Sequence, residues 1–288
     1  MVSKSLDIQS LFDVTGLVAV VTGGGSGIGL MAAQALEANG AIVYIIGRRK
    51  ESLEKAAATA KHNNIRPIVG DVTSKSSLAD AASTIGGETG GYVDLVVANS
   101  GIAGPSLAEL PKNADITTLQ NYLASWSTDQ FNQTFATNVT GVFNTIVAFL
   151  SLLDAGNKRE GRPKQSSQVI ATGSIGAYNR VPLAGYAYGS TKAAVHHMMK
   201  QFATGLAPFG IRSNVIAPGI FPSELTEDLV SQLDRGGWHR DFVPAERAGD
   251  AEDLAGAVLF LASKSGAYVN GNILVADGGR LGVVPSAY

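Results

Sequence analysis

Three residues of this chain have side chains suited to moving a proton together: Tyr188, Lys192 and Ser174. Residues four apart on a helix lie above one another, so the Lys192 ammonium can approach the Tyr188 phenol. An unperturbed tyrosine has a pKa near ~10 and is a poor acid or base at neutral pH. A nearby cation favours the phenolate and lowers that pKa. The pair therefore predicts general acid/base chemistry, with Lys192 lowering the pKa of Tyr188.

Ser174 follows an apolar run that is typical of a buried strand. Residues 168–172 form this run, and Gly173 precedes the serine. Its hydroxyl is therefore expected at the carboxyl edge of a sheet, where α/β proteins bind ligands. A tyrosine and a lysine at this spacing also arise by chance on amphipathic helices, so their meaning depends on the rest of the chain.

A glycine-rich turn near the amino terminus supplies that context. The apolar run 17–22 leads into Gly23-Gly24-Gly25-Ser26-Gly27-Ile28-Gly29, and good helix formers follow over 30–36. A strand, a glycine-rich turn and a helix together hold a pyrophosphate at the helix N-terminus, where free N–H groups and the dipole favour negative charge. The pattern predicts a nucleotide site.

Apolar strand-like runs alternate with helical stretches along the chain, at residues 42–46, 65–69, 95–98, 168–172, 211–216 and 273–276. This alternation predicts an α/β fold with a doubly wound parallel sheet and helices on both faces. No linker long enough to divide domains is evident, so residues 1–288 are expected to form a single domain.

Several motifs occur in an order that resembles the classical short-chain dehydrogenase/reductase family. They are Thr22 to Gly29, Ala98-Asn99-Ser100-Gly101, Asn138, Ser174, Tyr188-x-x-x-Lys192 and Pro218-Gly219. The resemblance covers residues 17–279 and implies a Rossmann-type fold with a substrate loop at about 220–248. Residues 214–223 are similar to the branch of 3-oxoacyl reductases and related fungal reductases.

The resemblance implies roles for the catalytic residues Asn138, Ser174, Tyr188 and Lys192. Tyr188 would act as general acid/base, Lys192 would also hold the nicotinamide ribose, and Ser174 would donate to the substrate oxygen. Asn138 would hold a water that connects the lysine to solvent.

The same family pattern gives a set of expected coenzyme contacts. They are Gly23, Gly25, Ser26, Gly27, Ile28, Arg48, Arg49, Asp71, Val72, Asn99, Gly101, Tyr188, Lys192, Pro218, Gly219, Ile220 and Thr226. Asp71 would bond the adenine amino group, although capping of the next helix by Asp71 or Thr73 is an alternative. No metal is expected.

The second strand ends in Gly47-Arg48-Arg49, and no acidic residue lies between Glu37 and Glu51. A carboxylate at this place would accept hydrogen bonds from the ribose of NAD. Guanidinium groups instead suit the 2′-phosphate of NADP(H). The coenzyme is therefore expected to be NADP(H), with Arg48 the first contact and Arg49 the second; the alternative is that both arginines are only solvated.

Composition excludes several other chemistries. The chain has no cysteine, a formal charge of −2 and 16% charged residues, so it offers no thiolate metal site and no basic face for nucleic acid. No apolar run approaches the ~20 residues that cross a bilayer, and residues 1–16 lack a signal-like stretch. We expect a cytoplasmic protein without a membrane partner. His196 and His197 diverge around a helix and are expected at a surface or interface.

Two segments resemble insertions: a polar connection over residues 104–127 and a solvated loop over residues 156–167. The expected activity is an NADPH-dependent carbonyl reductase that interconverts a ketone, of the 3-oxoacyl or another secondary-metabolite class, and a secondary alcohol. Two alternatives remain open, a sugar or polyol dehydrogenase on the same fold and a non-catalytic NADP-binding regulator. The resemblance also implies a homotetramer or homodimer.

Overall fold

A seven-stranded parallel sheet forms the centre of the computed structural model, which describes residues 6–161, 163–182 and 184–288. Its strand order is β3-β2-β1-β4-β5-β6-β7. Val20 of β1 faces Tyr44 of β2 on one side and Val96 of β4 on the other. The strands are β1 (Val18–Thr22), β2 (Ile42–Gly47), β3 (Ile65–Val69), β4 (Leu95–Ala98), β5 (Gln168–Thr172), β6 (Arg212–Pro218) and β7 (Ile273–Ala276).

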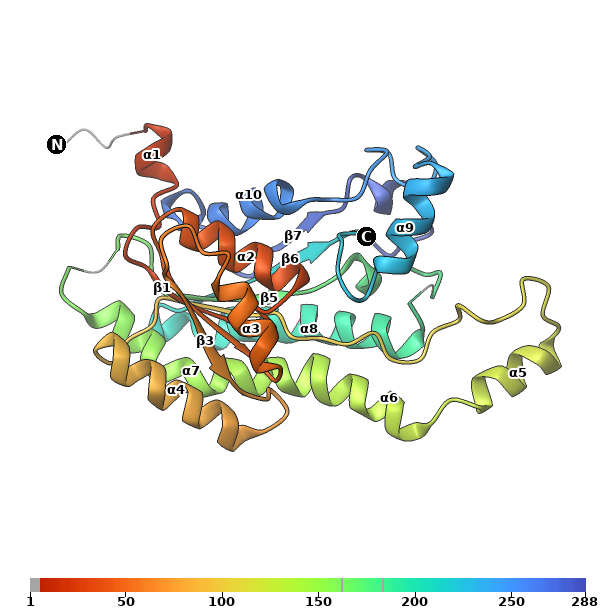
Figure 1. Cartoon of the computed structure of the whole chain (residues 1–288), viewed down its shortest axis with the longest axis horizontal. Helices are drawn as coiled ribbons and strands as arrows, with labels where there is room; N and C mark the ends of the chain where they lie inside the picture. The colour runs from red at the N-terminus through yellow and green to blue at the C-terminus, as the bar shows by residue number, and fades with distance from the viewer. Residues whose placement is uncertain (1–5, 162, 183) are drawn as a thin grey trace.

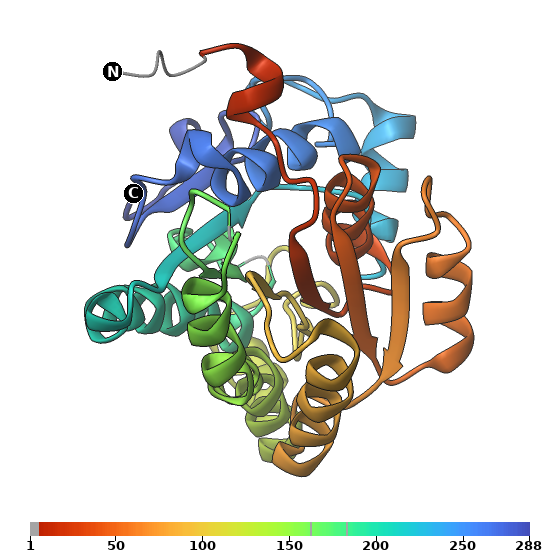
Figure 2. The ribbon, with the colours of Figure 1, turned by 90° about the vertical axis from the view of Figure 1, so that its left-hand side faces the viewer.

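Helices cover both faces of this sheet, as the alternating sequence pattern predicts (Figures 1 and 2). On one face lie α2 (Gly27–Ala38), α3 (Lys50–Ala57) and α10 (Ala251–Ala262). On the other lie α4 (Lys75–Thr89), α7 (Gly141–Lys158) and α8 (Tyr186–Gly205). The described chain also contains the shorter α-helices α1 (Ile8–Leu11), α5 (Ile116–Ala124), α6 (Thr128–Phe135) and α9 (Glu227–Gly236), together with short 3₁₀ and π-helical segments.

The strand order reverses between β1 and β4, because β2 and β3 lie on one side of β1 and β4 to β7 on the other. Helices cross over on opposite faces on the two sides of this point. Loops at the carboxyl ends of β1 and β4 therefore diverge and leave a crevice, which is where doubly wound sheets bind ligands. The predicted fold class is confirmed.

Both expected insertions differ in detail from the prediction. The connection over residues 104–127 contains the helix α5, whose side chains are all at least partly exposed and which extends from the body of the molecule (Figure 1). Asp115 caps it by accepting from the Thr118 N–H at 2.7 Å. In the second segment α7 continues through Gly156 and Asn157 to Lys158, so the loop is shorter than expected.

One continuous helical stretch, residues 128–158, is long and apolar enough to cross a bilayer by length and composition. Polar residues such as Asn138 and Asn144 interrupt this stretch, so it is not a continuous apolar run of the kind that the sequence analysis considered. Ile146, Phe149 and Leu153 are fully buried against the sheet, as in the core helix of a globular domain. These apolar residues are three and four positions apart, so they lie on one face of the helix. That face packs on the sheet, and the opposite face remains exposed.

A buried ion pair joins the start of the sheet to the end of α7. Asp94 accepts from the Val18 N–H at 3.0 Å and from both terminal nitrogens of Arg159. We expect Asp94→Ala to lower the free energy of unfolding by about 3 kcal/mol, because the partly buried Arg159 guanidinium loses its carboxylate partner and the buried Val18 N–H loses its acceptor. Urea denaturation measures this loss. Asp154→Ala, which removes the exposed pair with Lys158, should cost under ~1 kcal/mol; equal losses would contradict the assignment.

Candidate active site

A cleft of about 1240 Å³ opens at the carboxyl edge of the sheet and receives residues from the loops after β1 to β6. Almost every residue predicted from the sequence lies on its wall. These are Gly23, Gly25, Ser26, Gly27, Ile28, Arg48, Arg49, Asp71, Val72, Asn99, Gly101, Ser174, Tyr188, Lys192, Pro218, Gly219, Ile220 and Thr226. Asn138 is the exception, since it is buried behind the wall.

The glycine-rich turn between β1 and α2 has the shape needed to receive phosphates. Gly27 has a φ of +52°, which side-chain-bearing residues rarely adopt. A Cβ at Gly29 would stand 2.2 Å from the Gly23 carbonyl oxygen, so only glycine allows this close packing of turn and helix. Ser26 precedes the helix and makes no side-chain cap, so the first N–H groups of α2 are left for a ligand. These features fit a pyrophosphate.

At the end of the cleft beside β2, the two arginines that follow this strand differ in their contacts. Arg49 pairs with Glu224 from the loop before α9, although both side chains are largely exposed. Arg48 is also exposed, and its charge helps to lower the pKa of Asp71. Because the guanidinium of Arg49 already has a carboxylate partner, Arg48 is the better placed of the two to meet an additional anion.

Asp71 and Val72 follow β3 at the same end of the cleft. Asp71 Oδ1 accepts from the Thr73 N–H at 2.8 Å and from the Thr73 hydroxyl at 2.7 Å, which lowers the pKa of the carboxyl. Helix α4 is capped by Ser74, which accepts from the Ser77 N–H at 3.2 Å. Neither Asp71 nor Thr73 is therefore the N-cap residue, and the helix-capping alternative does not apply.

Asn99 joins three strand ends beneath the cleft. Its Nδ2 donates to the Thr22 carbonyl oxygen at 3.0 Å, and its Oδ1 accepts from the Thr172 hydroxyl at 2.9 Å. Its backbone N–H donates to the Thr22 hydroxyl at 3.0 Å. The side chain thus links the ends of β1, β4 and β5 and fixes the floor on which a ligand would rest.

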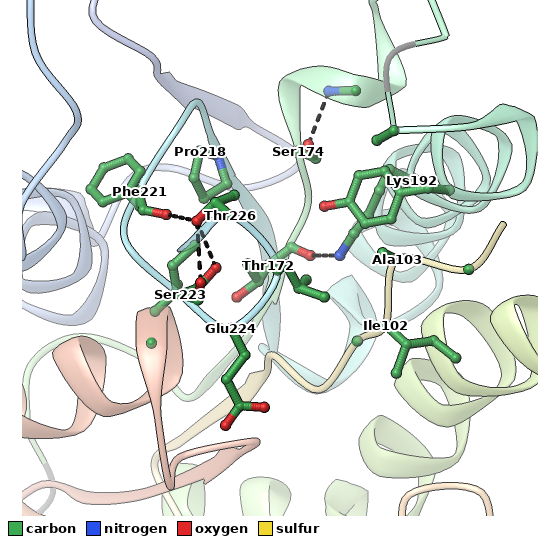
Figure 3. A pocket seen from close by; sticks show the side chains of 18 of the residues that line it. Ile102, Ala103, Thr172, Ser174, Lys192, Pro218, Phe221, Ser223, Glu224 and Thr226 are labelled. Atoms are coloured by element: carbon green, nitrogen blue, oxygen red, sulfur yellow. Dashed lines mark hydrogen bonds between the residues drawn. The ribbon is translucent and has the colours of Figure 1, made fainter. Parts of the chain in front are cut away.

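Ser174, Tyr188 and Lys192 converge at the other end of the cleft. Ser174 Oγ accepts from the Gly176 N–H at 2.9 Å, and the serine hydroxyl hydrogen-bonds the Tyr188 phenol. Lys192 Nζ donates to the Thr172 carbonyl oxygen at 2.8 Å and lies 5.6 Å from the centre of the Tyr188 ring. Figure 3 shows this lysine bond between the end of β5 and α8. The predicted spacing on one helix face is present.

The expected lowering of the tyrosine pKa is wrong for this arrangement. Burial raises the pKa of Tyr188, and the Ser174 hydrogen bond opposes that rise only in part. The Lys192 ammonium is directed at a carbonyl oxygen rather than at the phenol oxygen, and burial lowers the pKa of the lysine to about 8. The tyrosine is thus held in its protonated form, as a proton donor requires.

Asn138 lies in a π-helical turn, Ala136–Thr140, between α6 and α7. Such turns are rare in proteins, and those that occur are often found at functional sites. Its Oδ1 accepts from the Ile102 N–H at 2.8 Å, and its Nδ2 donates to the Ile102 carbonyl oxygen at 2.9 Å and to the Thr191 hydroxyl at 3.1 Å. This amide therefore holds the loop after β4 against α8, directly behind Lys192. The water-holding role remains a prediction.

The loop after β6 forms the remaining wall of the cleft. Phe221 is buried beneath it, and the Thr226 hydroxyl donates to the Phe221 carbonyl oxygen and lies 3.0 Å from Ser223 Oγ. Figure 3 shows these three residues together on the loop. A Cβ at Gly27 would meet Ser223 Cβ at 3.0 Å, so the loop reaches the glycine-rich turn. It continues into α9, which lies within the expected substrate loop.

Two functional candidates were missed by the sequence interpretation, Glu224 and His196. Glu224 carries no motif, and only the fold brings it to Arg49. His196 was expected at a surface but is 5% exposed, and its Nε2 accepts from the Ser174 N–H at 3.4 Å. A signal was available, because His196 is four residues after Lys192 and continues the helix face of Tyr188.

Comparison with known proteins agrees with this fold. The family model described as Enoyl-(Acyl carrier protein) reductase matches residues 23–280. The chain is 52% identical over 291 residues to the short-chain dehydrogenase/reductase PhomF of Diaporthe leptostromiformis, covering 100% of this chain and 99% of that protein. It is 32% identical over 270 residues to the rhamnolipids biosynthesis 3-oxoacyl-[acyl-carrier-protein] reductase of Pseudomonas aeruginosa, covering 93% and 97%.

Among solved structures, gluconate 5-dehydrogenase from Burkholderia cenocepacia in complex with NADP and tartrate superimposes with a TM-score of 0.79 at 29% identity, covering 96% of this chain and 100% of that one. The chain belongs to the short-chain dehydrogenase/reductase family of oxidoreductases. The resemblance drawn from the sequence motifs is thereby confirmed.

Proposed function

We propose that this protein is an NADPH-dependent carbonyl reductase that interconverts a ketone and a secondary alcohol. The observation that carries the proposal is the convergence of Ser174, Tyr188 and Lys192 in the cleft that also contains the glycine-rich turn. The Tyr188 phenol and the Ser174 hydroxyl therefore lie in the same cleft as a turn that can receive phosphates. NADP in the complexed gluconate 5-dehydrogenase supports the choice of coenzyme.

The residues of the chain divide the chemical work among them. Bound NADPH would supply a hydride to the carbonyl carbon. The Ser174 hydroxyl would hold the carbonyl oxygen, where fixed dipoles stabilise developing negative charge. Tyr188 would give its proton to that oxygen, and Lys192 would stabilise the resulting phenolate and orient the ribose. The first turn of α2 would hold the pyrophosphate, and Arg48 the 2′-phosphate.

The cleft lining favours an apolar ketone over a polyol. Apolar residues form much of the wall outside the coenzyme contacts, and Asn179, Arg180, Asp228 and Gln232 are polar members of the same wall; the apolar ones include Ile102, Ala103, Val181, Pro182, Leu225, Leu229 and Phe242. Such a wall contributes affinity through burial of apolar substrate surface, whereas a polyol needs many hydrogen-bonding partners. The 3-oxoacyl reductase relative supports a 3-oxoacyl or secondary-metabolite ketone, and the gluconate 5-dehydrogenase keeps the sugar alternative for the test.

The test is a substrate panel followed by the loss of NADPH absorbance. Hydrophobic 3-oxoesters and aryl ketones should be reduced with kcat/KM at least roughly tenfold above that for keto-sugars, a difference that one or two buried methylenes can supply. Preference for keto-sugars would favour the polyol alternative. Tight NADPH binding without reduction of any ketone would favour the non-catalytic regulator.

Coenzyme choice has its own test at Arg48. We expect Arg48→Ala to raise the KM for NADPH roughly 10–100-fold and to leave the KM for NADH nearly unchanged. NADPH has a 2′-phosphate that would lose its guanidinium partner, whereas NADH has no such phosphate. Steady-state kinetics with each coenzyme measures both values. Lys50→Ala, which removes an exposed cation two residues after Arg48, is the matched control. Equal changes for the two coenzymes would show that Arg48 does not bind the phosphate.

The proposal also places the protein in the cytoplasm as a homodimer or homotetramer. The absence of cysteine suits a reducing compartment. Phe143 and Val147, four residues apart on α7, are more than 40% exposed and give that helix an apolar outer face. Light scattering on the purified protein measures the number of subunits.

A further inference from the structure

His196 lies directly beneath Ser174, and its environment is unusual for a core side chain. Its Nε2 accepts from the Ser174 N–H at 3.4 Å. Its Nδ1 is buried and makes no hydrogen bond within the described part of the chain. The ring packs on Tyr178 with centroids 5.1 Å apart. An unpaired buried nitrogen costs free energy that an apolar residue would avoid, so the imidazole requires an explanation beyond packing.

We propose that His196 is a positioning residue for Ser174: its imidazole accepts the serine N–H and thereby fixes the hydroxyl toward the substrate oxygen. The inference rests on the proposed function for the role of Ser174. The histidine touches neither substrate nor coenzyme, since it does not line the cleft. It acts only through the backbone of the serine.

The hydrogen bonds around Ser174 explain how a backbone contact orients the hydroxyl. The backbone is extended, with φ −170° and ψ 151°, and the 3₁₀ turn Ile175–Ala177 follows at once. The Gly176 N–H donates to Ser174 Oγ at 2.9 Å and occupies one lone pair of the oxygen. His196 thus holds the Ser174 N–H, and the Gly176 N–H holds Ser174 Oγ. The hydroxyl proton of Ser174 remains free to be donated to Tyr188 or to the carbonyl oxygen of a substrate.

The close approach of the imidazole also accounts for the residue before the serine. A Cβ at Gly173 would lie 2.3 Å from His196 Nε2, so any side chain there would displace the ring from the Ser174 N–H. The absence of a side chain at Gly173 thus leaves space for the His196 ring directly after the end of β5. The ring edge formed by Nε2 and Cδ2 faces Gly173 as well as the Ser174 N–H.

The charge state of His196 suits an acceptor. Burial, with smaller contributions from Lys192 and Lys200, lowers the pKa of His196 to about 4. The ring is therefore neutral at neutral pH and keeps a lone pair for the Ser174 N–H. For Nε2 to accept, the single ring proton must be on Nδ1. The structure consequently specifies one tautomer.

Kinetics of three variants test the positioning role. His196→Leu should lower kcat roughly 10²-fold, the cost of a small misplacement of a reacting group, while the KM for NADPH stays within about twofold. His196→Gln, whose Oε1 can reach the place of Nε2, should restore most of the kcat. His197→Leu changes the adjacent exposed histidine and should match the wild type. Equal kcat losses for His196→Leu and His196→Gln, or no loss for either, would overturn the proposal.

A second measurement does not depend on turnover. ¹⁵N-histidine NMR of the full chain, with the His196 signals identified by their absence in His196→Gln, reports the ring protonation of the four histidines. We expect the Nδ1–H tautomer for His196 at neutral pH. A proton on Nε2 would overturn the contact with the Ser174 N–H. Should the wild type reduce no ketone, the proposed function would fail while this measurement still decided the contact.

Discussion

Replacing Tyr188 by Phe is expected to lower kcat for ketone reduction by roughly 10³-fold, within the range for loss of a general acid. The substitution removes one oxygen from a half-buried ring and leaves the packing of α8 unchanged. NADPH binding should therefore persist, because the glycine-rich turn and Arg48 are untouched. Steady-state turnover and titration of NADPH fluorescence measure the two quantities separately.

Tyr186→Phe provides the matched control for this experiment. Tyr186 lies two residues earlier on the same helix, is 48% exposed and has Ser190 rather than a lysine four residues later. Its loss should change kcat by less than about twofold, since neither substrate oxygen nor Lys192 depends on it. Full activity in Tyr188→Phe, or an equal loss in Tyr186→Phe, would remove the tyrosine from the mechanism.

Replacing Lys192 by Met is expected to lower kcat by roughly 10²–10³-fold and also to raise the KM for NADPH. The variant keeps most of the buried stem but removes the cation that would stabilise a phenolate and hold the ribose. Loss of both properties distinguishes this residue from Tyr188, whose removal should affect kcat alone. Kinetics with varied NADPH at saturating ketone measure the two parameters.

Lys200→Met is the control, because Lys200 is exposed two turns further along α8. The pH profile gives a second measurement. Since burial lowers the pKa of Lys192 to about 8, the ammonium of the free protein is present below this pH and is lost above it. The kcat/KM for reduction should therefore fall as the pH rises through about 8. A Lys192→Met variant with wild-type kcat and KM would contradict its role.

Much of the fold could be predicted because a central strand of a parallel sheet is buried on both faces and therefore appears in the sequence as a continuous apolar run. The runs at 65–69, 95–98, 168–172 and 273–276 match β3, β4, β5 and β7 to the residue. Continuous apolar stretches that alternate with helices leave few other arrangements. Strand ends were less certain at β6, where the strand continues through Pro218 because the hydrogen bonds to β7 extend that far.

The sequence was less informative wherever a contact joins distant segments. Arg49 and Glu224 are 175 residues apart and meet only because the loop after β6 reaches the glycine-rich turn. The direction of the Tyr188 pKa also depends on three-dimensional detail, namely where the Lys192 ammonium points. Helix α5 has no buried residue. Its apolar residues Ile116, Leu119 and Leu123 do have helical spacing, so this helix could have been predicted from the sequence although it contributes nothing to the core.

The burial of His196 shows a different limit. Its position continues the spacing of Tyr188 and Lys192, so the helix face could be predicted. Whether the side chain of His196 is buried depends on Gly173, because the missing side chain of this glycine leaves space for the ring. Helical periodicity places a residue on a face, whereas only packing across elements determines whether a polar side chain there is buried.

The central claim is that a phenol, a serine hydroxyl and an ammonium act on a carbonyl beside a bound nicotinamide. A crystal structure of the wild-type protein with NADP⁺ tests it most directly. We expect the nicotinamide beside Ile220, its ribose at Lys192, and the Tyr188 hydroxyl and Ser174 Oγ facing the same substrate-sized space. NADP⁺ bound with its nicotinamide outside this end of the cleft, or a Tyr188 hydroxyl turned away from it, would contradict the account.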